Sequence, residues 1–208
     1  MKLQISFDLL ELDKALAIAN EISPYADIVE IGSLLIYKYG IHAITEFRRT
    51  LPTTPLLADV KTADRGRETV ELMASAGADW ITVMGATNKA VIHSACTMAR
   101  KINKKIMLDL MDEESPGQRT MEAKALGSHA ILFHRPHDAQ ASLEFLDQWD
   151  MIRGNTDLPI FVSAKFDQII AAEVAKLQPD GIVVGPAITE DPDPVTQAKF
   201  YHELCHGK

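Results

Sequence analysis

This chain has few cysteines, few aromatic residues and no excess of positive charge. Its only cysteines among 208 residues, Cys96 and Cys205, fall on separate expected helices. Such a pair favours free thiols over a disulfide framework or a zinc knuckle. The formal net charge of -8 at pH 7 disfavours binding along a nucleic-acid backbone, because that affinity comes from clustered Lys and Arg. We therefore expect no nucleic-acid partner.

Long hydrophobic runs are also missing, and none approaches the roughly 18 residues of a membrane span. Residues 1–8 indicate a strand rather than a signal peptide, so we expect a cytoplasmic protein without membrane contact. A hydrophobic content of 47% with 24% charged residues is typical of a globular protein. The length fits a single α/β domain over residues 1–208.

Eight short apolar runs alternate with amphipathic stretches, such as 9–22 and 67–76, at a spacing of about 25 residues. The runs cover residues 3–7, 28–31, 55–58, 80–83, 106–110, 130–133, 160–162 and 182–184. This alternation predicts parallel strands joined by helices, and eight such units predict a compact (β/α)8 TIM barrel. The alternative, an open doubly wound sheet, lacks its Gly-x-Gly-x-x-Gly signature after the first run.

One segment, Asp59-Val60-Lys61-Thr62-Ala63-Asp64, concentrates ionisable groups directly after a buried run. On an extended strand Asp59 and Lys61 point to the same side, and Asp64 falls in the turn before the next helix. Two carboxylates around an ammonium can hold a divalent cation, polarise a carbonyl and move a proton. A surface cluster of ion pairs is the alternative interpretation.

Polar residues stand at nearly every expected strand end, where a TIM barrel places its chemistry. Any one of them could instead cap a helix or a loop. In chain order the candidates are Asp8, Glu30, Asp59 with Lys61 and Asp64, Thr87 or Asn88, Asp109, His134 with Arg135 and His137, Ser163 with Lys165, and Gly185.

Glu30 and His134 are the most informative of these candidates. Glu30 lies inside an apolar strand, where a carboxylate without a partner would cost several kcal/mol. One possible partner is a metal ion shared with Asp59, and the carboxylate oxygens of such a site favour Mg²⁺ over zinc. The other is the ammonium of Lys61. His134 offers a base that titrates near neutral pH, beside cations suited to an anionic substrate.

These residues resemble a known family, the orotidine 5'-monophosphate decarboxylase suprafamily, over nearly the whole chain. Within it, the chain is most similar to the 3-hexulose-6-phosphate synthase and 3-keto-L-gulonate-6-phosphate decarboxylase groups. The Asp-x-Lys-x-x-Asp element at 59–64 is the most specific part of the resemblance. The other matching segments are residues 1–4 with Asp8, 29–32, 77–83, 133–134 with 138–140, and 184–189.

The resemblance implies a Mg²⁺-dependent homodimeric barrel that forms an enediolate from a sugar phosphate. It implies metal ligation by Glu30 and Asp59 and stabilisation of the enediolate by Lys61. It also implies that Asp64 reaches into the partner subunit's site and that His134 is the general acid or base. Asp8 would contact substrate hydroxyls.

Some positions separate the two groups within the family. Asp109, which we also expect to be catalytic, resembles the residue of the synthase at this position, and so does the segment 185–189. The synthase is an aldehyde-lyase that condenses formaldehyde with ribulose 5-phosphate. Residues 134–135 with 138–140 resemble the decarboxylase, with His137 where that group has its substrate arginine. The balance favours the synthase.

The expected phosphate cradle departs from both groups. Ser163-Ala164-Lys165 replaces a glycine pair, and Pro186 removes one N–H from the turn that begins at Gly185. Ser163 and Lys165 would supply a hydroxyl and a charge in compensation. This departure motivates a further alternative, a barrel that binds a sugar phosphate without turning it over.

Overall fold

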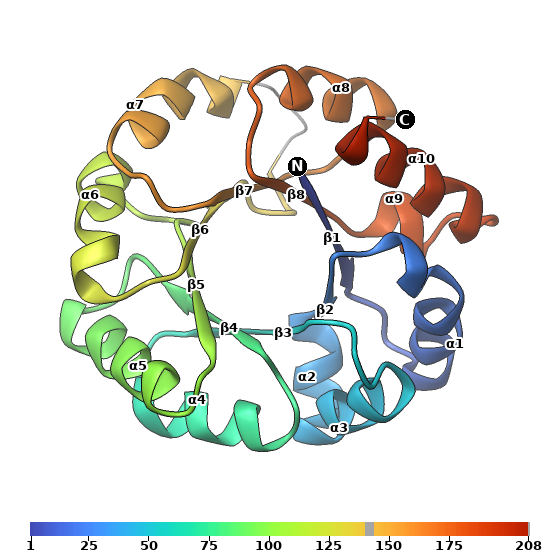
Figure 1. Cartoon of the computed structure of the whole chain (residues 1–208), viewed down its shortest axis with the longest axis horizontal. Helices are drawn as coiled ribbons and strands as arrows, with labels where there is room; N and C mark the ends of the chain where they lie inside the picture. Colours follow the sequence, from blue (N-terminus) through green and yellow to red (C-terminus); the bar gives the residue numbers. More distant parts are fainter. Residues whose placement is uncertain (140–143, 208) are drawn as a thin grey trace.

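The computed structural model describes residues 1–139 and 144–207, and its strands form one closed barrel in the order β1 to β8. Each strand pairs in parallel with its neighbours along the chain, and β1 closes the barrel against β8 (Figure 1). The expected (β/α)8 barrel is thereby confirmed. The strands are β1 (Lys2–Phe7), β2 (Ile28–Ile31), β3 (Leu56–Thr62), β4 (Trp80–Met84), β5 (Lys105–Asp109), β6 (Ala130–His134), β7 (Ile160–Ser163) and β8 (Gly181–Val184).

The helices form a ring outside the strands (Figure 1). They are α1 (Leu12–Ile22), α2 (Ser33–Tyr39), α3 (Ile41–Thr50), α4 (Gly66–Ser75), α5 (Lys89–Lys101), α6 (Pro116–Leu126), α7 (Trp149–Gly154), α8 (Gln168–Lys176), α9 (Pro186–Thr189) and α10 (Pro194–His206), with 3-10 turns η1 (Ser23–Tyr25) and η2 (Glu144–Gln148). The helix expected over 9–22 begins later, at Leu12, because the preceding residues form the loop that follows β1.

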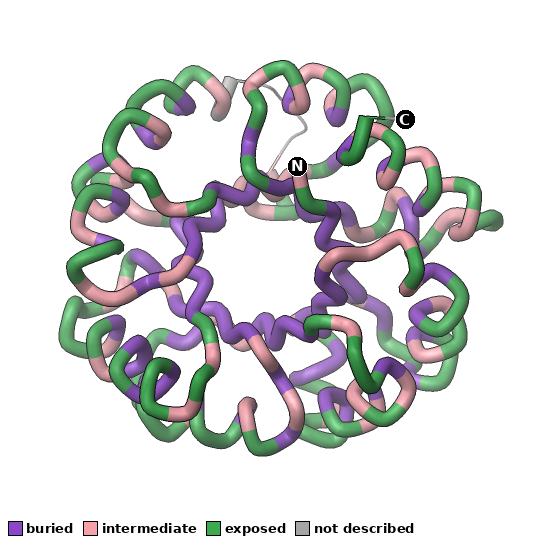
Figure 2. The backbone as a smooth tube through the Cα atoms, in the orientation of Figure 1, coloured by how far each residue is buried: buried purple, intermediate pink, exposed green. Residues whose placement is uncertain are grey.

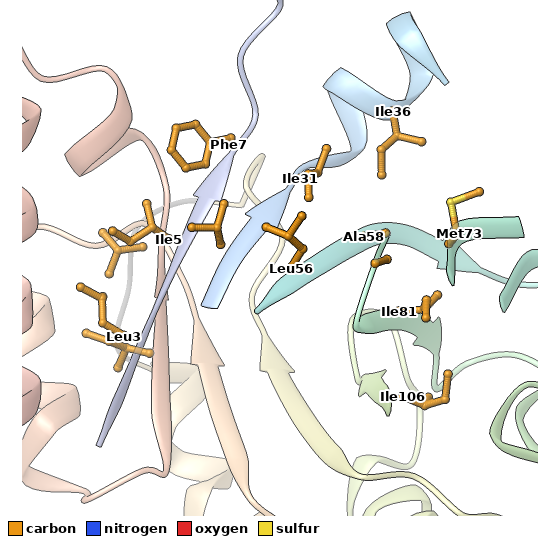
Figure 3. Close-up of a cluster of buried hydrophobic side chains, with 14 of the residues drawn as sticks. Leu3, Ile5, Phe7, Ile31, Ile36, Leu56, Ala58, Met73, Ile81 and Ile106 are labelled. Carbon is orange, nitrogen blue, oxygen red and sulfur yellow. The ribbon is translucent and has the colours of Figure 1, made fainter. Parts of the chain in front are cut away.

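Two apolar layers lie on opposite sides of the sheet. Leu3, Ile5 and Phe7 of β1 point outward and join the cluster between strands and helices, with Ile31 and Leu56 on the next strands (Figure 3). A separate cluster fills the interior, and its members are Ile28, Leu57, Trp80, Met107, Ala130, Leu132, Phe161 and Val183. The strands are accordingly buried on both faces over most of their length and appear as a largely buried inner ring (Figure 2).

Strand β3 is longer and less regular than the sequence indicates. The step from Ala58 to Thr62 on β3 faces the shorter step from Ile81 to Val83 on β4, so the register shifts between them. Within this bulge Lys61 adopts a left-handed backbone with φ of 46°. Such a conformation costs a residue with a side chain about 1–3 kcal/mol, and it tends to persist at functional sites.

At the N-terminal ends of the strands, Arg48 joins α3 to the loops around it. Its guanidinium donates to the carbonyls of Leu51, Thr54 and Gly77 at 2.9 to 3.1 Å and forms an ion pair with Asp79. Asp79 also accepts from the Leu56 N–H, at the start of β3. This network ties helix to sheet at the end of the barrel away from the candidate site.

The two cysteines are buried on α5 and α10 as free thiols, as expected. Burial raises the pKa of Cys96 to about 11 and that of Cys205 to about 12, so both remain protonated near neutral pH. Within the described residues, no helix has the length and apolar character needed to cross a bilayer.

Candidate active site

The C-terminal mouth of the barrel holds a cluster of buried ionisable groups. Glu30, Asp59 and Asp109 come from three different strands and are at most 6% exposed. Each lies one inward-facing position above a residue of the interior apolar cluster, namely Ile28, Leu57 and Met107 respectively. The alternation of these strands therefore places acids at the top of the barrel and hydrocarbon beneath them.

Lys61 stands between two of these carboxylates. Its ammonium lies 2.7 Å from Asp59 Oδ2 and 3.6 Å from Asp109 Oδ2. Burial opposes the charged form, but the carboxylates of Asp59 and Asp109 outweigh it and raise the pKa of Lys61 above its ordinary value. The side chain is therefore a fixed cation, and its reach toward Asp59 confirms that residues 59 and 61 share one side of the strand.

Asp109 links Lys61 to His134. Its Oδ2 lies 2.9 Å from His134 Nδ1, and its Oδ1 accepts the Met111 N–H at 2.9 Å. Burial disfavours the charged forms of both residues, but their mutual contact prevails, lowering the pKa of Asp109 and raising that of His134. If the proton of neutral His134 is on Nδ1, which faces the carboxylate, Nε2 is left as the basic nitrogen.

Glu30 is held by the first strand. Gln4 Nε2 donates to one carboxylate oxygen, and Ser6 Oγ lies 2.8 Å from the other. Burial, followed by the charges of Asp59 and Asp8, raises the pKa of Glu30 to about 8. The alternative of a direct Glu30–Lys61 pair is not what the structure shows, because the Lys61 ammonium pairs with Asp59 and Asp109.

Asp8 lies at the rim directly after β1, where Ser6 Oγ lies 3.0 Å from its Oδ2. Gly32, the residue after β2, packs against it so closely that a Cβ there would lie 2.2 Å from Asp8 Oδ1 and 2.6 Å from the Phe7 carbonyl. The glycine therefore sets how near the turn after β2 can approach the Asp8 carboxylate.

The expected phosphate-binding residues lie around the last two strands. Ser163 ends β7 in register with His134 and is partly buried, whereas Lys165 is exposed in the following loop. Gly185 precedes the short helix α9, and a Cβ there would meet Ser6 at ordinary contact distance, 3.5 Å from its carbonyl. Pro186 is the first residue of α9, in agreement with the loss of one N–H from this turn.

Two other predicted residues lie apart from the buried cluster. Asp64 is exposed and its Oδ1 accepts the N–H of the adjacent Arg65. The His137 side chain is 70% exposed, with its Nδ1 3.8 Å from Asp138. The structure therefore does not bring these two into contact with Lys61 or His134, and Gln140 of the 138–140 segment lies outside the described residues.

Three buried polar residues near this site were not among the candidates at the expected strand ends, namely Gln4, Ser6 and Thr82. Gln4 and Ser6 belong to the alternation Lys2-Leu3-Gln4-Ile5-Ser6-Phe7, which signals one polar face, and this signal was available in the sequence. Thr82 lies within the fourth run. The candidates proposed for that strand have other partners, since Thr87 donates to the Ala63 carbonyl and Asn88 caps α5.

The arrangement suits chemistry in which negative charge develops on a substrate. It combines a fixed cation, a histidine oriented by a buried carboxylate and two further acids. Within residues 1–139 and 144–207, no group of three or more His, Cys, Asp or Glu side chains is arranged as a metal site. Glu30 and Asp59 alone could still ligate Mg²⁺, which commonly takes one or two carboxylates and completes its shell with water and substrate oxygens.

Known proteins resemble this chain over nearly its whole length. A family model described as orotidine 5'-phosphate decarboxylase / HUMPS family matches residues 1–201. A 3-hexulose-6-phosphate synthase from Bacillus subtilis is 34% identical, covering 98% of both chains. One from Staphylococcus aureus is 32% identical over all of both chains. A crystal structure of a 3-hexulose-6-phosphate synthase superposes with a TM-score of 0.91 at 31% identity, covering 98% of this chain and 99% of that one.

Proposed function

The chain belongs to the orotidine 5'-phosphate decarboxylase / HUMPS family, and from this premise we propose that it is a Mg²⁺-dependent aldehyde-lyase of the 3-hexulose-6-phosphate synthase type. In this reaction ribulose 5-phosphate loses a proton from the carbon beside its carbonyl. The resulting enediolate attacks formaldehyde, a new carbon–carbon bond forms, and the former aldehyde oxygen takes up a proton.

The observation that carries this proposal is the chain of contacts from Asp59 through Lys61 and Asp109 to His134. A fixed ammonium can stabilise an enediolate oxygen in a water-poor site, where such an interaction is strong. Fixed charge of this kind, with an oriented imidazole beside it, has no evident use in holding the barrel together.

Within this proposal His134 moves the proton. With Nδ1–H donated to Asp109, Nε2 carries the lone pair that removes the substrate proton. The same nitrogen can then return a proton to the oxygen of the new hydroxyl. The carboxylate of Asp109 fixes the ring and stabilises the imidazolium that forms.

The residues at the top of β2 and β3 fit a magnesium ion. The raised pKa of Glu30, near 8, comes from burial and from neighbouring carboxylates, so a cation there would relieve an existing excess of negative charge. We propose that Glu30 and Asp59 hold Mg²⁺, which when bound acts as a Lewis acid toward substrate oxygens. Asp8 would accept hydrogen bonds from substrate hydroxyls.

The decarboxylase of the same family is the second candidate. It would reach an enediolate by loss of CO₂ from 3-keto-L-gulonate 6-phosphate, and the sequence around residues 134–140 favours it. Asp109, where the decarboxylase pattern has glutamate, favours the synthase. Both candidates use the same ammonium and the same histidine, so substrate turnover must separate them.

The test incubates the purified chain with each sugar phosphate, with MgCl₂ or with EDTA. We expect formaldehyde to disappear in the presence of ribulose 5-phosphate and Mg²⁺, and EDTA to abolish the reaction. CO₂ release from the keto-gulonate phosphate alone would replace the synthase by the decarboxylase. If calorimetry detected binding of ribulose 5-phosphate and neither substrate turned over, the barrel would be a sugar-phosphate-binding protein.

A further inference from the structure

The hydroxyl of Thr82 connects the two functional residues of the β3 bulge. Thr82 is on the neighbouring strand β4, points into the barrel and is 1% exposed. Its Oγ1 accepts the backbone N–H of Lys61 at 2.9 Å and lies 2.9 Å from Asp59 Oδ1. Because a hydroxyl has a single proton and the Lys61 N–H already donates, the proton of Thr82 goes to Asp59.

The contact replaces a ladder bond that the bulge removes. The register between β3 and β4 is interrupted between Ala58 and Thr62, and Lys61 lies inside this interval with a left-handed backbone. Parallel pairing supplies no regular carbonyl partner for the Lys61 N–H there, and the Thr82 side chain takes that place. The hydroxyl therefore stabilises the unusual backbone from which the Lys61 side chain extends.

The same hydroxyl fixes one oxygen of Asp59. The other oxygen faces the Lys61 ammonium at 2.7 Å and Ser33 Oγ at 3.4 Å. Thr82 thus sets the carboxylate plane of Asp59 and the backbone of Lys61 together. Since threonine is branched at Cβ and has few χ1 states, it can hold both bonds with little loss of freedom.

We infer that Thr82 is a positioning residue for the Lys61 ammonium and the Asp59 carboxylate, and that the rate of the chemical step depends on its hydroxyl. The inference deepens the proposed function and rests on it. It assigns Thr82 no contact with substrate, so its loss should affect kcat more than KM.

The test compares Thr82→Val, which replaces the hydroxyl by a methyl group of similar shape, with Thr82→Ser, which keeps the hydroxyl. We expect Thr82→Val to lower kcat by about 10–100-fold, the size of effect that a small misplacement of a catalytic group produces. The KM for ribulose 5-phosphate should change by less than about 3-fold, because ground-state binding is retained. Thr82→Ser should keep most of the wild-type kcat.

Thr62→Val is the matched control. Thr62 is also buried, lies on β3 beside Lys61, and its Oγ1 makes no hydrogen bond in the structure. The same chemical change at Thr62 should leave kcat near the wild-type value. An equal loss of kcat in Thr62→Val and Thr82→Val would show that any change near the bulge matters, and it would overturn the inference.

Hydrogen exchange at the Lys61 amide provides a readout that needs no substrate. We expect exchange at this amide to be at least about 10-fold faster in Thr82→Val and close to wild type in Thr82→Ser, because only the latter keeps the acceptor. If the wild-type chain turned over neither sugar phosphate, the proposed function would fail, and with it the claim about rate. The exchange data would then decide the positioning claim alone, and unchanged exchange would reject it. Faster exchange with unchanged kcat would reduce Thr82 to a structural role.

Discussion

Asp109 and His134 form the pair whose titration governs the proposed proton transfer. Their contact raises the pKa of His134, although burial alone would lower it. The imidazole is a base only in its neutral form, so activity should fall as the pH drops through this raised pKa. The carboxylate therefore has two effects, orienting the ring and moving the pH at which the ring can act.

Replacing Asp109 by Asn should separate these two effects. Removal of the negative charge lowers the pKa of His134, so the acidic limb of the kcat/KM profile should move to lower pH. At the same time kcat should fall by at least about 100-fold. The side-chain amide of the new asparagine can donate to Nδ1 of His134 and so stabilise the tautomer whose proton is on Nε2, which is then no longer a base. NMR titration of His134 checks the shift directly, and His129, whose Nδ1 accepts the Ile106 N–H at the other end of β5, is the internal control. An unchanged His134 pKa would contradict the geometry.

The carboxylate of Glu30 should lower the free energy of unfolding of the barrel when no Mg²⁺ is bound. It is buried among other carboxylates, which disfavours its charged form. At pH 8 and without Mg²⁺, Glu30→Gln should raise the free energy of unfolding by about 1–2 kcal/mol, because it removes that charge and keeps the shape. Chemical denaturation measures the change, and Mg²⁺ should stabilise the wild-type chain but not the variant.

The control for this prediction is Glu203→Gln on α10, where the carboxylate is 46% exposed and 4.0 Å from Lys199. A surface change of this kind should stay within about 0.5 kcal/mol of wild type. A Glu30→Gln chain that unfolds more easily than wild type at pH 8 would show that the carboxylate is stabilising where it lies.

Among the elements, β3 and α3 show how the two ends of the barrel differ. The C-terminal end of β3 is irregular and carries Asp59 and Lys61, whereas its N-terminal end is held by the Arg48 and Asp79 network. In barrels of this type the N-terminal face supports stability and the C-terminal face carries the chemistry. Changes at the two ends should therefore have different consequences.

Arg48→Lys tests the stabilising end. A lysine keeps the charge but cannot reproduce the several directed bonds of the guanidinium, so we expect a loss of about 2–3 kcal/mol in unfolding free energy. Activity at a temperature well below unfolding should be unchanged. The adjacent Arg49→Lys is the matched control, because that side chain is 78% exposed and should lose little. Equal losses in both variants would refute the special role of Arg48.

Some elements could be predicted from the sequence and others could not. Apolar runs between amphipathic stretches were sufficient for the barrel and for most strand boundaries, since parallel strands are buried on both faces. The bulge in β3 was hidden, because register depends on the neighbouring strand and leaves no local pattern. For the same reason Thr82 was missed: its role comes from lying opposite the bulge, next to Lys61 in space and 21 residues away in sequence.

Part of the candidate site could also be predicted from the sequence. Five of its ionisable residues were identified because each follows or interrupts an apolar run, namely Glu30, Asp59, Lys61, Asp109 and His134. The partner of Glu30 was left open between a metal and Lys61, and the side chains that bond it, Gln4 and Ser6, come from β1. The parallel pairing of β1 with β2, in which Ser6 lies opposite Glu30, brings them together.

For the whole molecule, the outstanding expectation is a homodimer with shared sites. Asp64 is exposed at the rim and makes no side-chain contact with the Lys61 cluster of its own chain in the described structure. This position is compatible with its expected role in the site of a second copy, and sedimentation of the purified chain should show a dimer.

Mixing two inactive variants tests whether the sites are shared. Lys61→Ala and Asp64→Ala should each be inactive alone. After unfolding and refolding together, a mixed dimer would contain one site with both residues intact, so statistical mixing should restore about a quarter of the wild-type activity. No recovery from a mixture that contains mixed dimers would place Asp64 outside the partner's site.

The strict alternation of β1 also limits how this chain can vary. Loss or gain of one residue between Gln4 and Ser6, with the rest of β1 held in register, would turn Leu3 toward the lumen and the amide of Gln4 toward the helix layer. Since β1 is bonded on both sides, to β2 and β8, the strand cannot slide to absorb the change. Insertions and deletions in homologous chains should therefore avoid this strand, and a library with single-codon deletions should tolerate them least there.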